Sequence, residues 1–187
     1  PGSPFSLLQG CELLLAPCRE RMGASDFVAV SACLSSARAQ FGLNFDGHLW
    51  LAVELHLAPD DSLWLATLQR VGGALQLPLV AAGDVHMHAR SRKPLQDVIT
   101  AVQRGCSVAE CGFALQPNAE RHLRQRVRLA GIYPPELLAA TLTVAARCTF
   151  SLGEIRYQYP LETVPSGMTP AQGLAWLTYE GAASRYP

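Results

Sequence analysis

Apolar runs separated by helical stretches give the first part of the chain an α/β pattern. Four runs predict buried strands, at Glu12 to Ala16, Phe27 to Ser31, Leu49 to Leu57 and Leu79 to Ala82. They are continuous rather than alternating, which is typical of parallel strands covered on both faces. Between them, residues 35–41 predict a short helix and residues 62–75 a longer one.

The longer helix carries one apolar stripe, with Asp60 or Asp61 placed to cap its first turn. The stripe has helical spacing and consists of Trp64, Leu68, Val71 and Leu75. Such a stripe more often packs into a core than binds a ligand, so we interpret it as core.

After Pro94 the pattern becomes helical. Pro94 suits the first turn of a helix that runs through Val102 and ends at Gly105. Further helices are predicted at 118–129, with Asn118 as the cap, and from Pro134 to Cys148. An α/β part of about the first hundred residues is therefore expected to precede an all-helical tail.

The last part of the chain predicts a linker and a final helix. Residues 153–160 are expected to be extended. The string Thr169-Pro-Ala-Gln172 has the form of a capping box with proline at the first helical position.

Composition and charge exclude several classes of protein. With 187 residues, 49% hydrophobic and 16% charged, the chain is expected to fold as a globular domain with an appended helical piece, not as a disordered segment. The formal net charge is zero, so no overall field attracts nucleic acid or membrane. Arginines do cluster at 90–93 and 121–128. We interpret the second cluster as a solvated helix face, with contact to DNA backbone or a partner subunit as the alternative.

The six cysteines show no Cys-X-X-Cys spacing, so a zinc ribbon is not indicated and most are expected to be buried thiols. The sequence lacks a signal peptide and a long apolar span, which favours a cytoplasmic location and reduced thiols. Both ends of the chain resemble cut ends, so we expect a fragment of a longer protein.

The most informative stretch is Leu-Val-Ala-Ala-Gly-Asp-Val-His-Met-His at 79–88. An apolar run leads to a glycine and then to Asp84 and His86 at alternating positions, which point the same way on an extended backbone. A carboxylate and an imidazole are usual ligands of zinc, manganese or iron, and a carboxylate suits magnesium. His88 is interpreted as a surface or supporting residue.

Residues 81–88, followed by residues 92–102, resemble the last metal-ligand motif of the polymerase and histidinol phosphatase (PHP) domain of bacterial C-family DNA polymerases. The stretch Ala-Glu-Cys-Gly-Phe-Ala-Leu-Gln-Pro-Asn-Ala-Glu-Arg-His-Leu-Arg (109–124) is similar to the error-prone, alpha-type branch of that family. Residues 154–160 and 181–187 resemble the link from that domain toward the palm and fingers.

The resemblance implies a fold and a metal site. It implies a partial, distorted β/α barrel of PHP type, TIM-like, whose metal ligands gather at the C-terminal strand ends. Asp84 and His86 match one ligand motif, and His56 lies where the family supplies another ligand, with Glu54 on the same face. The site for manganese, zinc or magnesium would be incomplete, because the first ligand strands of the family would precede Pro1.

The resemblance also implies a division and a function. Residues 1–105 would be the C-terminal part of the barrel, 106–153 the helical end of the PHP domain, and 154–187 a linker and the start of the following polymerase region. The full enzyme would be an error-prone DNA-directed DNA polymerase acting on DNA and deoxynucleotides during damage-induced mutagenesis, in contact with other subunits. The fragment alone would lack the polymerase active site. The alternatives are a metal-dependent phosphoesterase and an inactive scaffold that contacts DNA or partner subunits.

Overall fold

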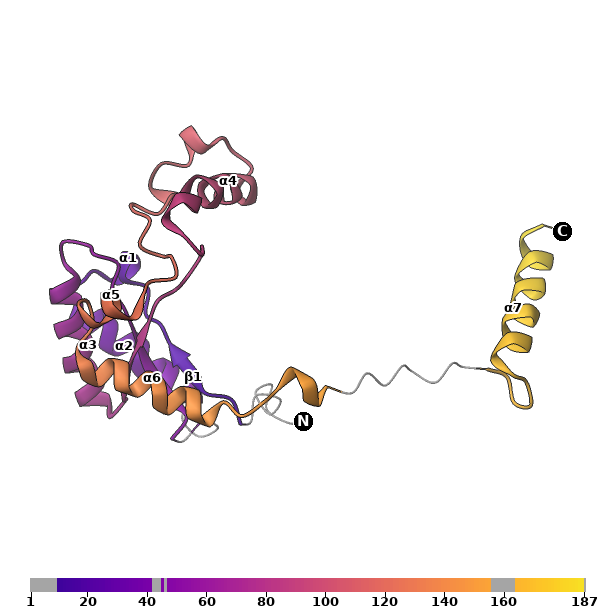
Figure 1. Cartoon of the computed structure of the whole chain (residues 1–187), viewed down its shortest axis with the longest axis horizontal. Helices are drawn as coiled ribbons and strands as arrows, with labels where there is room; N and C mark the ends of the chain where they lie inside the picture. Colours follow the sequence, from indigo (N-terminus) through magenta and orange to yellow (C-terminus); the bar gives the residue numbers. More distant parts are fainter. Residues whose placement is uncertain (1–9, 42–44, 46, 156–163, 187) are drawn as a thin grey trace. The chain divides into compact units, whose positions relative to one another are not determined.

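The structure is a computed structural model that describes residues 10–41, 45, 47–155 and 164–186. Its contacts divide the chain into two compact units, Pro1–Thr149 and Phe150–Pro187, each of which is described by itself (Figure 1). The three-part division at residues 105 and 153 stays a prediction.

The first unit contains a three-stranded parallel sheet in the order β1-β2-β3. The strands are β1 (Leu13–Leu15), β2 (Leu49–Glu54) and β3 (Leu79–Ala82). Leu51 of β2 lies opposite Leu15 on one side and Leu79 on the other. Three of the four predicted strands and their parallel arrangement are therefore confirmed, as is a mixed α/β class. A closed barrel is not seen in the part of the chain that the structure describes.

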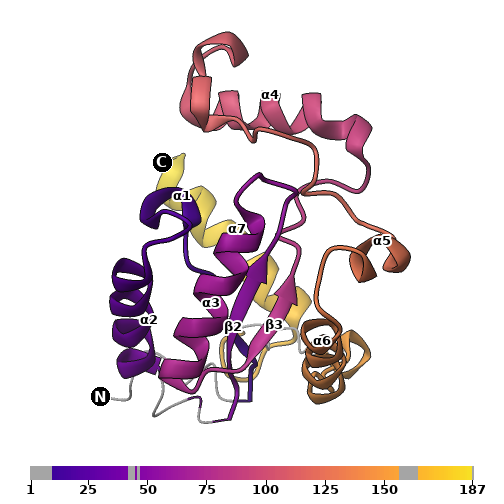
Figure 2. The same ribbon diagram turned by 90° about the vertical axis from the view of Figure 1, so that its left-hand side faces the viewer.

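The first unit also contains helices. They are α1 (Arg19–Met22), α2 (Phe27–Phe41), α3 (Asp61–Leu75), α4 (Lys93–Arg104), α5 (Arg126–Ala130) and α6 (Pro135–Arg147). Figure 2 shows β2 and β3 between the pair α2 and α3 on one side and α6 on the other. In both views α4 stands apart from the sheet, on an excursion of the chain between β3 and α5.

The core lies between the sheet and the helices α2, α3 and α6. Trp64, Leu68 and Val71 are buried in it, so the apolar stripe of α3 is core, as the sequence predicts. Gly72 lets α3 approach β3 closely, because a Cβ there would clash with the Leu79 side chain.

The strand predicted at residues 27–31 is wrong, because these residues begin α2. An apolar run of this length fits either a buried strand or a helix. The carboxylate Oδ1 of Asp26 accepts the backbone N–H of Ala29 at 2.9 Å, which satisfies a free donor of the first helical turn. The predicted helix at 35–41 is the second half of the same helix.

The helix predicted at 118–129 is also wrong, since only Arg126–Ala130 is helical. The side chain of Asn118 does not cap it. Its Nδ2 donates to the carbonyl of His56 at 2.7 Å and its Oδ1 accepts the N–H of Glu120 at 2.9 Å. The next residues run beside the chain after β3, where Met87 and His122 form an isolated parallel bridge. These contacts with residues far away in the sequence replace the hydrogen bonds within a helix that the prediction assumed.

Two other helix boundaries match the prediction. α4 ends at Gly105, which adopts the left-handed conformation with φ of 66°. α6 spans nearly all of the predicted helix between Pro134 and Cys148.

The second unit contains a 3-10 turn at Leu152–Glu154 and α7 (Pro170–Arg185). The capping box of α7 is confirmed, because the Thr169 N–H donates to Gln172 Oε1 at 2.9 Å and the Gln172 N–H donates to Thr169 Oγ1 at 3.4 Å. Residues 156–160 of the predicted linker lie outside the described residues. None of the helices described is long and apolar enough to span a membrane.

Candidate functional site at the carboxyl ends of the strands

A cavity of about 570 Å³ opens at the carboxyl ends of the strands. Glu54 is the last residue of β2 and His56 follows it by two positions, while Asp84 follows the last residue of β3 by two. Because β2 and β3 are parallel, these side chains reach the same edge of the sheet, and all three line the cavity. Residues of α1 and of the 116–121 segment close its other sides.

Asp84 and His86 converge, as their spacing predicts. His86 Nε2 lies 3.2 Å from Asp84 Oδ1. The backbone of Asp84 has a φ of 40°, in the left-handed region that residues other than glycine seldom adopt. Backbone strain of this kind concentrates at functional sites and ligand clamps.

His56 lies in the same cavity but makes a different contact. Its Nε2 donates to the carbonyl of Gly83 at 3.0 Å, so this ring nitrogen holds the turn that carries Asp84. Two of the three candidate ligands, His56 and Asp84, therefore line the cavity, and His86 contacts Asp84 without being part of the lining. No group of three or more His, Cys, Asp or Glu side chains arranged to hold a metal ion occurs within residues 10–41, 45, 47–155 and 164–186.

Arg121 supplies the positive charge beside Asp84, whereas Arg19, which also lines the cavity, pairs with Asp60 and Asp61. The Arg121 side chain is only 12% exposed and its Nη1 contacts Asp84 Oδ2. Its Nη2 lies 3.7 Å from a carboxylate oxygen of Glu20, and its Nε donates to Gln116 Oε1 at 3.0 Å. The guanidinium thus lies where a cation bound by the Asp84 carboxylate would lie.

The surroundings shift two ionisable groups toward their neutral forms. Burial raises the pKa of the Glu54 carboxyl, although the nearby Arg121 guanidinium opposes this and Glu20 adds to it. Burial also lowers the pKa of His56, against the hydrogen bond to Gly83 and with the help of Arg121. The cavity therefore disfavours uncompensated charge.

Tyr133 joins the two strands beneath this cavity. Its buried hydroxyl donates to the carbonyl of Ala82 at 2.7 Å and accepts the N–H of Leu55 at 3.1 Å. Arg124 extends the network, donating from Nη2 to the same hydroxyl at 3.2 Å and from Nη1 to the Leu55 carbonyl at 2.8 Å. Neither role is predictable from the sequence, because the partners of Tyr133 and Arg124 at Leu55 and Ala82 lie far away in the chain.

The arginines at 121–128 do not form the solvated helix face that the sequence predicts. Arg121 and Arg124 point into the protein, as described above. Arg128 Nη2 donates to the buried carboxylate of Glu120 at 3.1 Å, and Arg90 pairs with the same carboxylate. Three of the four arginines of the cluster therefore have internal partners.

The cysteines also differ from the expectation. Cys111 is buried and Cys106 is half-buried, whereas the other four are exposed, namely Cys11, Cys18, Cys33 and Cys148. Most of the thiols therefore do not act as core residues. Cys33 lies on the exposed surface of α2, and Cys18 and Cys148 lie at the ends of α1 and α6.

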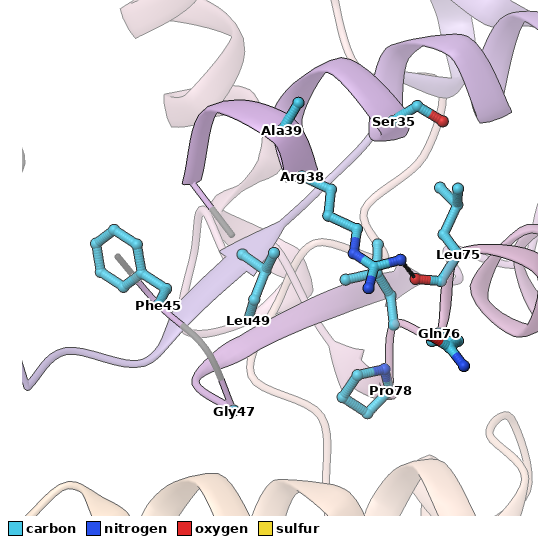
Figure 3. Close-up of a pocket in the computed structure, with 10 residues that line it drawn as sticks. Ser35, Arg38, Ala39, Phe45, Gly47, Leu49, Leu75, Gln76 and Pro78 are labelled. Carbon is cyan, nitrogen blue, oxygen red and sulfur yellow. Dashed lines mark hydrogen bonds between the residues drawn. The ribbon is translucent and has the colours of Figure 1, made fainter. Parts of the chain in front are cut away.

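A second cavity, of about 620 Å³, lies near the opposite ends of β2 and β3 (Figure 3). Among the described residues that line it, Arg38 is the one that carries a charge, and its guanidinium donates to the carbonyl of Leu75 at the end of α3. The other described lining residues are apolar or uncharged. Within that part of the chain, this cavity lacks the converging ionisable groups of the first one.

Comparison with known proteins decides the relationship. The chain is 49% identical over 185 residues to an error-prone DNA polymerase of Dechloromonas aromatica, which covers 99% of this chain and 17% of that protein. It is 52% identical over 147 residues to an error-prone DNA polymerase of Azoarcus sp., covering 79% of this chain and 14% of that protein. The corresponding protein of Pseudomonas aeruginosa is 52% identical over 143 residues, 76% of this chain and 14% of that protein.

The chain matches one segment of bacterial error-prone DNA polymerases. The resemblance to the error-prone branch that the sequence indicates is thus confirmed. The segment spans 14% to 17% of the length of these polymerases. No family model matches it.

Proposed function

We propose that the chain is a scaffold segment of a bacterial error-prone DNA polymerase. The observation that carries this proposal is the identity of about half of its residues to such polymerases over 76% to 99% of the chain. The full enzyme would copy DNA from deoxynucleotides in the cytoplasm, including damaged templates, in contact with other replication or mutagenesis subunits. The residues that transfer nucleotides would belong to other segments of that enzyme.

We also propose that the α/β part is of PHP type, a portion of a distorted β/α barrel. Two features support this. The strands are parallel, and the candidate site lies at their carboxyl ends, where enzymes of barrel type place their functional residues.

The residues of the cavity do not fit a resident divalent metal. Asp84 and His86 offer two suitable donors, but the second carboxylate oxygen of Asp84 is engaged by Arg121. The Nε2 of His56 is used by the Gly83 carbonyl. A zinc site takes three or four protein ligands. A magnesium site takes one or two carboxylates, and the Asp84 carboxylate is already paired with Arg121, so we derive no chemistry through a metal.

We propose instead that this cavity is a structural corner in which Arg121 balances the carboxylates. The guanidinium neutralises Asp84 directly and Glu20 at longer range. It also lies close enough to Glu54 to oppose the rise of its pKa. A charge-balanced corner of this kind fixes the loops after β2 and β3, and it explains why a cavity with PHP-like residues needs no ion to be stable.

A metal-dependent phosphoesterase is the second candidate. The contact of His86 with Asp84, which lines the 570 Å³ cavity, favours it. Hydrolysis assisted by two metal ions needs ligands for both ions, and Arg121 competes for one of the two donors. Turnover of a phosphodiester with manganese that is lost in Asp84→Ala would revive this candidate.

The scaffold proposal is tested by exchange into a relative. The matching segment of the Dechloromonas aromatica polymerase is replaced by this chain, and primer extension is measured on intact and on damaged templates. We expect the exchanged enzyme to retain extension on both templates, while the isolated chain extends neither. Primer extension by the isolated chain would contradict the proposal, as would a soluble exchanged enzyme that no longer extends primers.

A further inference from the structure

Two thiols meet at the end of α4. The Sγ atoms of Cys106 and Cys111 lie 3.4 Å apart, although five positions separate the residues in the chain. Cys106 directly follows Gly105, the residue at which α4 ends. The candidate site uses neither thiol, and neither lies in the cavity beside Asp84.

Local hydrogen bonds build the turn that brings the sulfurs together. The N–H of Cys106 donates to the carbonyl of Ala101 at 3.2 Å, which fixes Cys106 against the last turn of α4. A capping box between Ser107 and Glu110 then reverses the chain, with the Ser107 N–H donating to Glu110 Oε2 at 2.8 Å. The N–H of Cys111 closes the turn on the Val108 carbonyl at 3.3 Å. The backbone of this turn therefore brings the two thiols close together.

The same turn contains two points where the backbone can adjust. Gly105 and Gly112 flank the thiol pair, with φ of 66° and 51°. Glycine takes such conformations without steric cost. A disulfide has an S–S distance of roughly 2.0 Å, so the two sulfurs need to approach by about 1.3 Å, which small rotations at these positions and at the side chains allow.

The two cysteines differ in their exposure to solvent. Cys106 is half-buried and Cys111 is buried. An oxidant in solution therefore reaches Cys106 first, and Cys111 is positioned as the thiol that resolves the oxidised form. This arrangement of an accessible sulfur beside a resolving sulfur is typical of redox-sensitive cysteines.

We propose that Cys106 and Cys111 form a reversible, peroxide-sensitive dithiol. The Cys106 thiolate attacks hydrogen peroxide, an S–O bond forms, the O–O bond breaks, and the released hydroxide takes up the thiol proton as water. The sulfur of Cys111 then attacks the sulfenic sulfur of Cys106, forming the disulfide and releasing a second water molecule. Both sulfurs are oxidised and one peroxide is reduced to two molecules of water.

A disulfide between Cys106 and Cys111 would cross-link the end of α4 to the turn that follows it. α4 carries an exposed apolar stripe, formed by Leu95, Val98, Ile99 and Val102. The disulfide would hold the end of the helix that bears this stripe, and it would limit fraying of the last turn.

The test is peptide mapping after a brief exposure of the 187-residue chain to hydrogen peroxide. Remaining thiols are blocked with a maleimide under denaturing conditions, and the chain is digested with trypsin. Cleavage after Arg104 and Arg121 gives one peptide, 105–121, that contains both thiols. We expect this peptide to carry no maleimide and to be lighter than its dithiol form by two hydrogen atoms. When the peroxide-treated chain is reduced with dithiothreitol before the maleimide is added, both thiols should again be labelled.

Two controls separate this closure from general oxidation. In Cys106→Ser, Cys111 should stay reduced at the same dose, while Cys33→Ser should leave the behaviour of peptide 105–121 unchanged. Oxidation in concentrated urea serves as a control that needs no variant, and closure should be several-fold faster in the folded chain. The proposal would be overturned if peptide 105–121 still carried two maleimides at a dose that oxidises exposed thiols such as Cys33. It would also be overturned if the disulfide formed at the same rate in urea and in buffer.

Discussion

Removing one hydroxyl group at Tyr133 should destabilise the first unit. The hydroxyl makes three hydrogen bonds, to the Ala82 carbonyl, the Leu55 N–H and the Arg124 guanidinium. Tyr133→Phe keeps the ring and its packing but leaves the N–H of Leu55, a buried residue, without this partner. An unsatisfied buried polar group costs about 1–3 kcal/mol. With two backbone groups affected, we expect a loss of about 2–4 kcal/mol in the free energy of unfolding.

Urea unfolding followed by tryptophan fluorescence measures this loss, because Trp50 and Trp64 are both buried in the first unit. Tyr179→Phe is the matched control, since it deletes the same atom from a side chain that is 78% exposed on α7. The control should change stability by less than about 0.5 kcal/mol. If Tyr133→Phe also stayed within that range, the hydroxyl would not hold β2 to β3, and the account of how the cavity is supported would be refuted.

Three further predictions test other parts of the structure. Glu120→Gln should lower the free energy of unfolding in urea by about 1–3 kcal/mol. The loss is smaller than that from breaking a fully buried ion pair, because the side chains of Arg90 and Arg128 are 49% and 40% exposed. An unchanged urea midpoint would contradict this. Burial lowers the pKa of His56 in the folded state, so it contributes stability that is lost as the pH falls below the ordinary histidine pKa toward the lowered one. His56→Gln should therefore flatten the pH dependence of unfolding in that window, and a parallel curve would refute the assignment. Thr169→Ala removes the side-chain cap of α7 and should destabilise the helix by about 1 kcal/mol. The variant should therefore show a smaller helical signal in circular dichroism than the wild-type chain. Equal signals for the two chains at all temperatures would count against the cap.

Local signals in the sequence predict a large part of the fold. The run Leu79–Ala82 is the strand β3 to the residue, Gly105 ends α4, and the capping box at Thr169 begins α7. Each of these features depends on neighbouring residues only. The convergence of Asp84 and His86 is of the same kind, because the alternation of an extended chain is enough to produce it.

Two of the failures come from interactions between residues that are far apart in the sequence. The amide of Asn118 binds the backbone of His56, 62 positions earlier, so it is not free to cap a helix. Arg121 looks like one member of a charged surface helix in the sequence, and only the folded chain brings it to Asp84. The error at 27–31 was avoidable, since Asp26 stands at the start of the run as a helix cap.

The most direct test of the structural corner is a titration of manganese into the purified chain by calorimetry, with Arg121→Ala and Asp84→Ala beside it. The account predicts no specific binding to the wild-type chain, because the Arg121 guanidinium already balances the Asp84 carboxylate. It also predicts that Arg121→Ala gains affinity for the ion, since the carboxylates around the cavity then lack their cation. Tight binding by the wild-type chain that disappears in Asp84→Ala would contradict it and would identify the cavity as a working metal site.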